Sequence, residues 1–255
     1  MHNIMVLNAK GGCGKTTIAT TLACYFSAQG FKTALMDFDP QRSSTRWLEV
    51  RSPENPDIRP IDATKPATGV TRTWQLYSGQ GTDVVIIDTP AGSSGGQLTD
   101  YLNRADTIII PVMASIIDLN AVEDFLEGLL KMSRHRLNGK RVCLVANRVR
   151  TKNSNIYRQI EALSEKTGIP LVASLRDTQN YPIAMESGIG ICELKSTRST
   201  RKDRQQLQPL TDWLHDGLPE TITGNLPDSR EPQWQQPLAV AAAPGSGSEL
   251  IRKAA

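Results

Sequence analysis

Short, largely apolar segments recur along this chain, and longer segments with helical periodicity separate them. The apolar runs occupy residues 4–7, 33–36, 84–87, 107–112 and 142–146. A strand buried on both faces gives such continuous runs, whereas a strand with one exposed face alternates polar and apolar residues. The pattern therefore predicts an α/β protein with a doubly wound, mostly parallel sheet that carries helices on both faces.

Three of the intervening helices have readable limits. They are predicted over residues 16–29, 120–132 and 155–167, and Gly30 and Gly168 end the first and the third. Four prolines between residues 52 and 69 predict a surface excursion, followed by a helix over residues 71–78.

The composition changes near residue 218. The last 38 residues hold five of the chain's 15 prolines, an Ala-Val-Ala-Ala-Ala run and Gly-Ser-Gly-Ser. A segment with so little periodic apolar surface cannot offset the entropy of ordering it. We therefore expect one domain over residues 1–217 and a disordered tail over residues 218–255.

Several protein classes lack support in the composition. The four cysteines form no C-x-x-C pair, so neither a zinc site nor a redox motif is indicated, and we expect reduced thiols in a cytoplasmic protein. The first residues have no basic region, and no apolar run reaches the roughly 18 residues that a membrane span needs. The formal net charge of +3 is too small to identify a partner by itself.

The strongest motif follows the first apolar run and opens the first helix. Glycines in this position let backbone N–H groups and the helix N-terminus converge on phosphate oxygens. We expect the last lysine of the motif to reach the β and γ phosphates of a nucleotide, and the threonine after it to bind Mg²⁺. The predicted phosphate-binding residues are Lys10, Gly11, Gly12, Cys13, Gly14, Lys15, Thr16 and Thr17.

Carboxylates end two further apolar runs. Asp88 ends the run at residues 84–87, where an aspartate would hold the water shell of magnesium. Asp37 and Asp39 follow the run at residues 33–36, so they should emerge at the same carboxyl edge of the sheet, where doubly wound folds bind ligands.

Three motifs in this order resemble those of the ParA/MinD family of P-loop ATPases. The octet from Lys10 is similar to the deviant Walker A motif, Asp37-Phe38-Asp39-Pro40-Gln41 to the next motif, and residues 85–90 to Walker B. The resemblance implies an ATPase that uses ATP and Mg²⁺ and forms an ATP-dependent sandwich dimer. In that dimer Lys10 would reach the phosphates held by the partner subunit.

The resemblance also assigns individual roles. It implies that Lys10, Lys15 and Asp39 are catalytic, with Asp39 orienting the attacking water, and that Thr16, Asp39 and Asp88 serve the metal. Asp37 would support magnesium or the loop. Asn147 matches the position that contacts adenine, because an amide can both donate and accept at the purine edge; alternatively, it caps a turn at the strand end.

Family members differ in what the ATP-bound dimer binds. The C-terminal segment lacks the amphipathic helix with which MinD-like proteins bind membranes, so a membrane partner is disfavoured. ParA-like proteins bind nucleoid DNA without sequence preference, and a run of cations would suit DNA phosphates. The predicted DNA-binding residues are Lys195, Arg198, Arg201, Lys202 and Arg204. The alternative is an ordinary solvated face.

The resemblance thus implies a nucleoid-associated, cytoplasmic ParA-type ATPase that positions a cargo with the help of an adaptor that stimulates hydrolysis. A protein cargo of the carboxysome type is favoured over a chemoreceptor array or a plasmid. The alternatives are a metabolic ATP-dependent enzyme on the same nucleotide-binding core and a MinD-like membrane-associated ATPase. Iron–sulfur chemistry is excluded, because the loops at residues 91–95 and 113–115 contain no cysteine.

Overall fold

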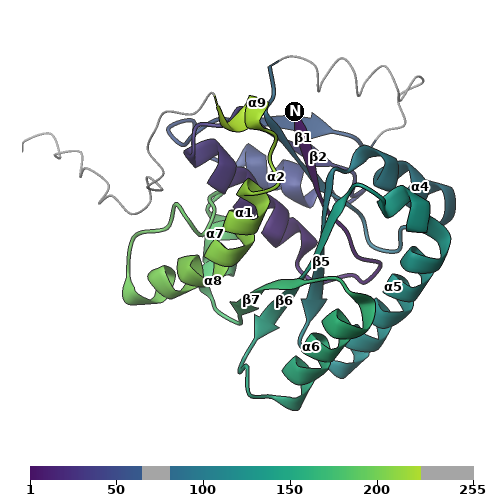
Figure 1. Cartoon of the computed structure of the whole chain (residues 1–255). Coiled ribbons are helices and arrows are strands. Elements are labelled where there is room, and N and C mark those ends of the chain that lie inside the picture. Colours follow the sequence, from purple (N-terminus) through teal and green to yellow (C-terminus); the bar gives the residue numbers. More distant parts are fainter. Residues whose placement is uncertain (65–80, 225–255) are drawn as a thin grey trace, which may run out of the picture.

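Seven parallel strands form one sheet in the order β3-β2-β4-β1-β5-β6-β7 (Figure 1). This computed structural model describes residues 1–64 and 81–224, with the backbone alone for residues 132–136. The strands are β1 (His2–Val6), β2 (Thr33–Asp37), β3 (Ile58–Asp62), β4 (Val84–Asp88), β5 (Thr107–Met113), β6 (Arg141–Val149) and β7 (Leu171–Arg176). The five apolar runs coincide with strands, except that Leu7 lies one residue beyond β1, and the expected fold class is confirmed.

Helices cover both faces of the sheet. One face carries α1 (Lys15–Ala28), α2 (Ser43–Glu49), α7 (Asn180–Glu186), α8 (Arg198–His215) and α9 (Glu220–Thr223). The other carries α4 (Gly95–Arg104), α5 (Ile116–Leu137) and α6 (Asn155–Thr167). Because successive strand residues point to opposite faces, Ile4 and Val6 enter the first core while Met5 and Leu7 enter the second. This explains why the strands read as unbroken apolar runs.

The chain reverses its direction of strand addition at β1, which lies between β4 and β5. All strands point the same way, so the sheet has an amino edge, at which Met1 lies (Figure 1), and a carboxyl edge, at which the strands end. A switch of this kind opens a crevice at the carboxyl edge. The segment that follows β1 occupies that position.

The expected helices agree closely with the observed ones. The helix predicted over residues 155–167 is α6, and that over residues 16–29 is α1 shifted by one residue. The helix predicted over residues 120–132 is longer at both ends; it begins earlier because Ser115 caps α5 through a hydrogen bond from Asp118 N. The helix expected over residues 71–78 lies outside the described residues.

The surface excursion expected over residues 52–69 was wrong in one part, because β3 lies within it. This strand pairs with β2 alone and forms an edge of the sheet. An edge strand tolerates proline, which lacks a backbone donor, and β3 accordingly contains Pro60. β7, at the other edge, was not predicted at all.

The ordered domain also extends beyond the expected boundary at residue 217. Leu218 and Ile222 are buried in the first core, and α9 lies between residue 217 and the last described residue, Gly224. Residues 218–224 therefore belong to the domain and not to a tail. The remainder of the predicted tail, residues 225–255, lies outside the described residues.

All four cysteines are free and buried. Burial raises the pKa of the thiols of Cys13, Cys24, Cys143 and Cys192. These thiols stay protonated and inaccessible, which makes them side chains of the core rather than reactive groups. Among the described helices, none is both long and apolar enough to cross a membrane.

Candidate nucleotide site

The loop between β1 and α1 has the backbone that the glycine motif predicts. Gly12 and Gly14 have φ angles of 74° and 95°, in the left-handed region that side chains disfavour. Gly14 immediately precedes the first residue of α1. A glycine loop with this backbone, directly before a helix N-terminus, allows backbone amides and the positive end of α1 to converge on a phosphate.

The two lysines of the loop take different positions. Lys15 is buried, with 6% of its surface exposed, and its Nζ donates to the carbonyl oxygen of Lys10 at 3.0 Å. The Lys10 side chain is 39% exposed, and its Nζ lies 3.8 Å from Oδ1 of Asp118. One ammonium group thus lies within the loop, while the other extends from it to the first turn of α5.

Asp118 was not predicted as a site residue from the sequence, although the start of its helix has a recognisable capping pattern. Ser115 and Asp118 have the serine-x-x-acid spacing of a helix N-terminus, and their side chains share a hydrogen bond. The two residues between them, Ile116 and Ile117, are 61% and 73% exposed. Lys10 therefore lies beside an exposed apolar pair at the start of α5.

Asp88 is fully buried, and neither of its carboxylate oxygens has a hydrogen-bond partner among the described residues. The hydroxyl oxygen of Ser44, also fully buried, has no hydrogen-bond partner within residues 1–64 and 81–224, and this hydroxyl also favours the ionised form of Asp88. Burial raises the pKa of Asp88 to about 7; the Thr16 hydroxyl favours its ionised form and the charge of Asp37 opposes it. An unsatisfied buried carboxylate beside hydroxyls is a donor set that suits a hydrated Mg²⁺ ion.

Asp37 organises the loop that carries Asp39. The two residues Asp37 and Asp88 are in register on neighbouring strands, so both lie at the carboxyl edge. Asp37 accepts hydrogen bonds from Asp39 N at 2.9 Å and from the N and Oγ1 of Thr45 at 2.9 and 2.8 Å. With both oxygens engaged, Asp37 supports the loop, one of its two expected roles. The half-buried Asp39 accepts a bond from Gln41 N at 2.9 Å.

Asn147 reaches the phosphate loop. Its Nδ2 donates to Cys13 O at 2.8 Å, and its Oδ1 accepts from Arg148 N at 3.0 Å. The second bond is the local, turn-capping contact of the alternative interpretation. The first ties the end of β6 to the loop across the sheet, and the contact with adenine stays a prediction.

The basic segment begins α8, which was not predicted as a helix. Lys195, Arg198, Arg201 and Lys202 are exposed. Arg204 is only 5% exposed, and its guanidinium donates to the carbonyl oxygens of Ile191 and Leu194. The prediction that Arg204 belongs to an exposed DNA-binding set was wrong. Helical periodicity places Arg204 on the buried face of α8, together with Thr200 and Leu207.

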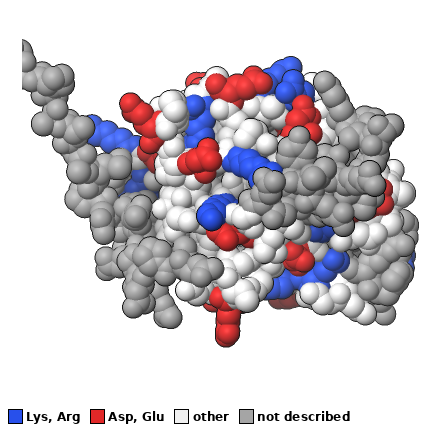
Figure 2. Space-filling model, turned by 90° about the horizontal axis from the view of Figure 1, so that it is seen from above, with Lys and Arg blue, Asp and Glu red and all other residues white. Residues whose placement is uncertain are grey.

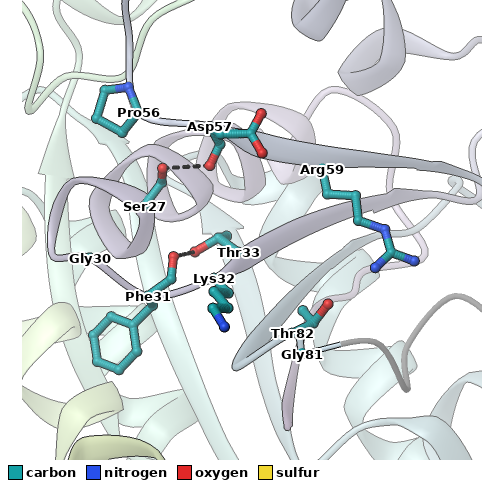
Figure 3. A pocket seen from close by; sticks show the side chains of 10 residues that line it. All are labelled: Ser27, Gly30, Phe31, Lys32, Thr33, Pro56, Asp57, Arg59, Gly81 and Thr82. Atoms are coloured by element: carbon teal, nitrogen blue, oxygen red, sulfur yellow. Dashed lines mark hydrogen bonds between the residues drawn. The ribbon is translucent and has the colours of Figure 1, made fainter. Parts of the chain in front are cut away.

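A hollow of about 340 Å³ lies at the other end of the sheet (Figure 3). Lys32 and Arg59 line it, near the starts of β2 and β3, far along these strands from the phosphate loop. The surface seen from this end carries acidic and basic side chains interspersed (Figure 2). The hollow is therefore separate from the candidate nucleotide site.

Comparison with known proteins identifies the family. A family model described as the CobQ/CobB/MinD/ParA nucleotide binding domain matches residues 4–191. The chain belongs to this family. The match covers the phosphate loop, both acidic motifs and Asn147, so the resemblance seen in the sequence is confirmed.

Two curated relatives narrow the comparison. The chain is 28% identical over 195 residues to the maintenance of carboxysome distribution protein A of Halothiobacillus neapolitanus, covering 75% of this chain and 87% of that protein. It is 30% identical over 156 residues to the chromosome-partitioning ATPase Soj of Thermus thermophilus, covering 51% and 61%. These relatives agree with the expected ATPase class.

Solved structures support the fold. McdA of Cyanothece in complex with ATP aligns with a TM-score of 0.61 at 21% identity, covering 83% of this chain and 96% of that one. MinD of Pyrococcus horikoshii, complexed with Mg-ADP, aligns with a TM-score of 0.60 at 18% identity, covering 84% and 97%. The expected cofactors, ATP and Mg²⁺, agree with the contents of these neighbours.

Proposed function

We propose that this chain is a ParA-type ATPase that forms an ATP-dependent sandwich dimer, binds DNA without sequence preference and positions a protein cargo. The observation that carries the proposal is the difference in position between the two lysines of the phosphate loop. Lys15 is buried in the loop, whereas Lys10 extends from it. Two cations on one loop can serve two phosphate groups, one in the same subunit and one in its partner.

The residues fit a phosphoryl transfer to water. Lys15 and the loop amides would neutralise the phosphates in the same subunit, and Lys10 would leave Asp118 to complete that neutralisation in the partner. Asp39, held by Asp37, would orient the attacking water. When bound by Thr16 and Asp88, Mg²⁺ would supply charge neutralisation between the phosphates. Hydrolysis would then reverse the dimerisation.

Variants of the three catalytic residues test this assignment. We expect Lys15→Ala to abolish nucleotide binding, Lys10→Ala to keep binding but block dimerisation and hydrolysis, and Asp39→Ala to accumulate an ATP-bound dimer. Binding is measured by calorimetry, dimers by light scattering with ATP, and turnover by phosphate release. If the Lys10→Ala variant hydrolyses ATP at the wild-type rate, the protein is instead a metabolic enzyme. If the Asp39→Ala variant does so, Asp39 does not orient the attacking water.

DNA binding is tested separately. Retention on a non-specific duplex should require ATP and fall as salt rises, because phosphate contacts release counterions. Reversing the exposed charges Arg198→Glu and Arg201→Glu should weaken retention. Lys32→Glu, at the amino edge, is the matched control and should not. Equal retention by all variants would show that the basic segment at the start of α8 is an ordinary solvated face and does not bind DNA.

The cargo is proposed from the relatives. The alignment with the carboxysome distribution protein A of Halothiobacillus neapolitanus includes 87% of that protein. This favours a carboxysome-type cargo over a chemoreceptor array or a plasmid. We expect an adaptor that accelerates hydrolysis, and a nucleoid-associated position in the cytoplasm. Capture of the ATP-bound Asp39→Ala dimer, followed by a hydrolysis assay on each captured protein, identifies the adaptor.

A further inference from the structure

Three arginines continue the basic surface away from α8, along the carboxyl edge of the sheet. They are Arg148, near the end of β6, Arg150, directly after β6, and Arg176, the last residue of β7. We propose that Arg148 and Arg150 bind the phosphate backbone of DNA as part of one surface with Arg198, Arg201 and Lys202. This inference rests on the proposed DNA binding and assigns further residues to it.

Hydrogen bonds and ion pairs join the two groups of residues. The Nε atoms of Arg148 and Arg150 lie 3.2 and 3.6 Å from the two carboxylate oxygens of Asp177. Arg176, the residue before Asp177, donates from Nη2 to Ser199 Oγ at 2.7 Å. Ser199 lies between Arg198 and Arg201 in the first turns of α8. The exposed arginines of β6 are therefore continuous with the basic start of α8.

The balance of charge leaves this surface positive. One carboxylate, Asp177, faces two arginines, whose side chains are 59% and 88% exposed. The other carboxylate, Asp203, is buried and pairs with Arg176. Each guanidinium presents five N–H donors, and the ion pairs of Arg148 and Arg150 with Asp177 use Nε. The terminal nitrogens of both are suited to phosphate oxygens.

The backbone of Arg148 gives an independent reason to assign a function. Its φ angle is 53°, and it is one of only two non-glycine residues with positive φ among residues 1–64 and 81–224. Glycine would adopt this conformation without steric cost. Strain of this kind concentrates at functional sites. The surrounding structure holds this conformation, in part through the bond from Arg148 N to Asn147 Oδ1 at 3.0 Å, and places the side chain at the surface.

DNA is favoured over the nucleotide as the ligand of these two arginines. Arg148 directly follows Asn147, a residue of the candidate nucleotide site. However, Arg150 is almost fully exposed, and the ion pairs hold both guanidinium groups on Asp177, on the side of β7 and α8. A polyanion that lies across α8 would contact both groups at once.

Two substitutions test the inference while leaving the fold in place. Arg148→Gly removes the guanidinium and relieves the left-handed strain, and Arg150→Glu reverses a charge in solvent. We expect thermal midpoints no lower than that of the wild type, unchanged ATP affinity, and retention on a non-specific duplex that is several-fold weaker at 100 mM salt for each variant. The dependence of log affinity on log salt should be shallower by about one unit for each arginine that no longer binds a phosphate.

The control is Lys32→Glu, which changes the charge at the amino edge and should bind DNA like the wild type. Wild-type retention and salt dependence in both arginine variants, together with a loss in Arg198→Glu, would overturn the inference and leave the proposed function standing. A parallel loss of ATP affinity would overturn it in favour of the nucleotide. If the wild type shows no ATP-dependent retention, the proposed DNA binding itself fails.

Discussion

Two glycines of the phosphate loop share a left-handed backbone but differ in their surroundings. A Cβ atom on Gly14 would collide with Nδ2 of Asn147, whereas one on Gly12 would meet nothing within 4 Å. We therefore expect Gly14→Ala to displace Asn147 from Cys13 and to lower nucleotide affinity at least tenfold. Gly12→Ala should cost only the backbone strain, about 1 kcal/mol of unfolding free energy.

Calorimetric titration with ATP and urea unfolding of both variants measure these effects. The two substitutions add the same methyl group to the same loop, so each is the control for the other. If both lose equal affinity, the contact between Asn147 and the loop has no part in nucleotide binding.

The residues of the site could be predicted as far as they follow from local motifs and strand ends. The loop, Asp37 and Asp88 meet at the carboxyl edge because parallel strands end there. Asp118 is 108 positions from Lys10, and no pattern within either segment brings them together. Arg204 was misplaced because the helix that buries it was not recognised, although Leu207, Leu210 and Leu214 have helical spacing.

Among the elements, the segment after α2 and the loop between α7 and α8 are joined by one buried ion pair. Arg51 and Glu193 are 6% and 11% exposed at their side chains and form two bonds, of 2.8 and 2.5 Å. Arg51 also donates to Gly188 O at 3.1 Å. Removing one partner leaves a buried charge, so we expect Arg51→Met to lower the free energy of unfolding by about 3 kcal/mol or more.

A double-mutant cycle in urea measures the coupling between the two residues. The double variant Arg51→Met with Glu193→Leu should be more stable than the sum of the single changes predicts, because both charges are absent. The exposed pair of Lys166 and Glu123 is the control and should show a coupling below about 1 kcal/mol. Additive effects at Arg51 and Glu193 would contradict the expectation.

The elements that could not be predicted lie mostly at the margins of the sheet. The central strands are apolar throughout because both faces are covered. The edge strand β3 buries only Ile58 and Ile61, without regular alternation, and contains proline, so its sequence resembles that of a loop. α8 carries many charges near its start, and its apolar residues appear only in its second half.

For the molecule as a whole, His215 and Asp88 should make contributions of opposite sign to stability as pH falls below neutral: the pKa of Asp88 is raised by burial to about 7, which favours the folded state on acidification, whereas His215 opposes it. The Nε2 of His215 lies 2.9 Å from the Tyr25 hydroxyl, and its ring packs against Phe26 and Phe31. Burial lowers the pKa of His215, although Asp212 and Asp216 oppose the shift. The unfolded chain then binds the proton more readily. The contribution of His215 is complete above the ordinary value of about 6.5 and is lost as pH falls through the folded-state pKa.

Thermal unfolding at pH 7.5 and pH 5.5 tests the sign of the His215 contribution. His215→Gln keeps a polar group near Tyr25 but does not titrate, so on going from pH 7.5 to pH 5.5 its midpoint should shift less toward lower temperature than that of the wild type. His2 and Asp88 are present in both proteins, so their contributions cancel in this comparison. An equal or larger shift toward lower temperature in the variant would show that His215 makes no such contribution.

The burial of all four native thiols has a practical consequence for spectroscopy. A maleimide dye at neutral pH should react rapidly only with a cysteine introduced at the surface, so no native cysteine needs to be replaced. Ile117, 73% exposed beside Lys10 and Asp118, is a suitable position for such a label. Energy transfer between donor- and acceptor-labelled chains would then follow the association of two subunits in real time, during a single cycle of nucleotide hydrolysis.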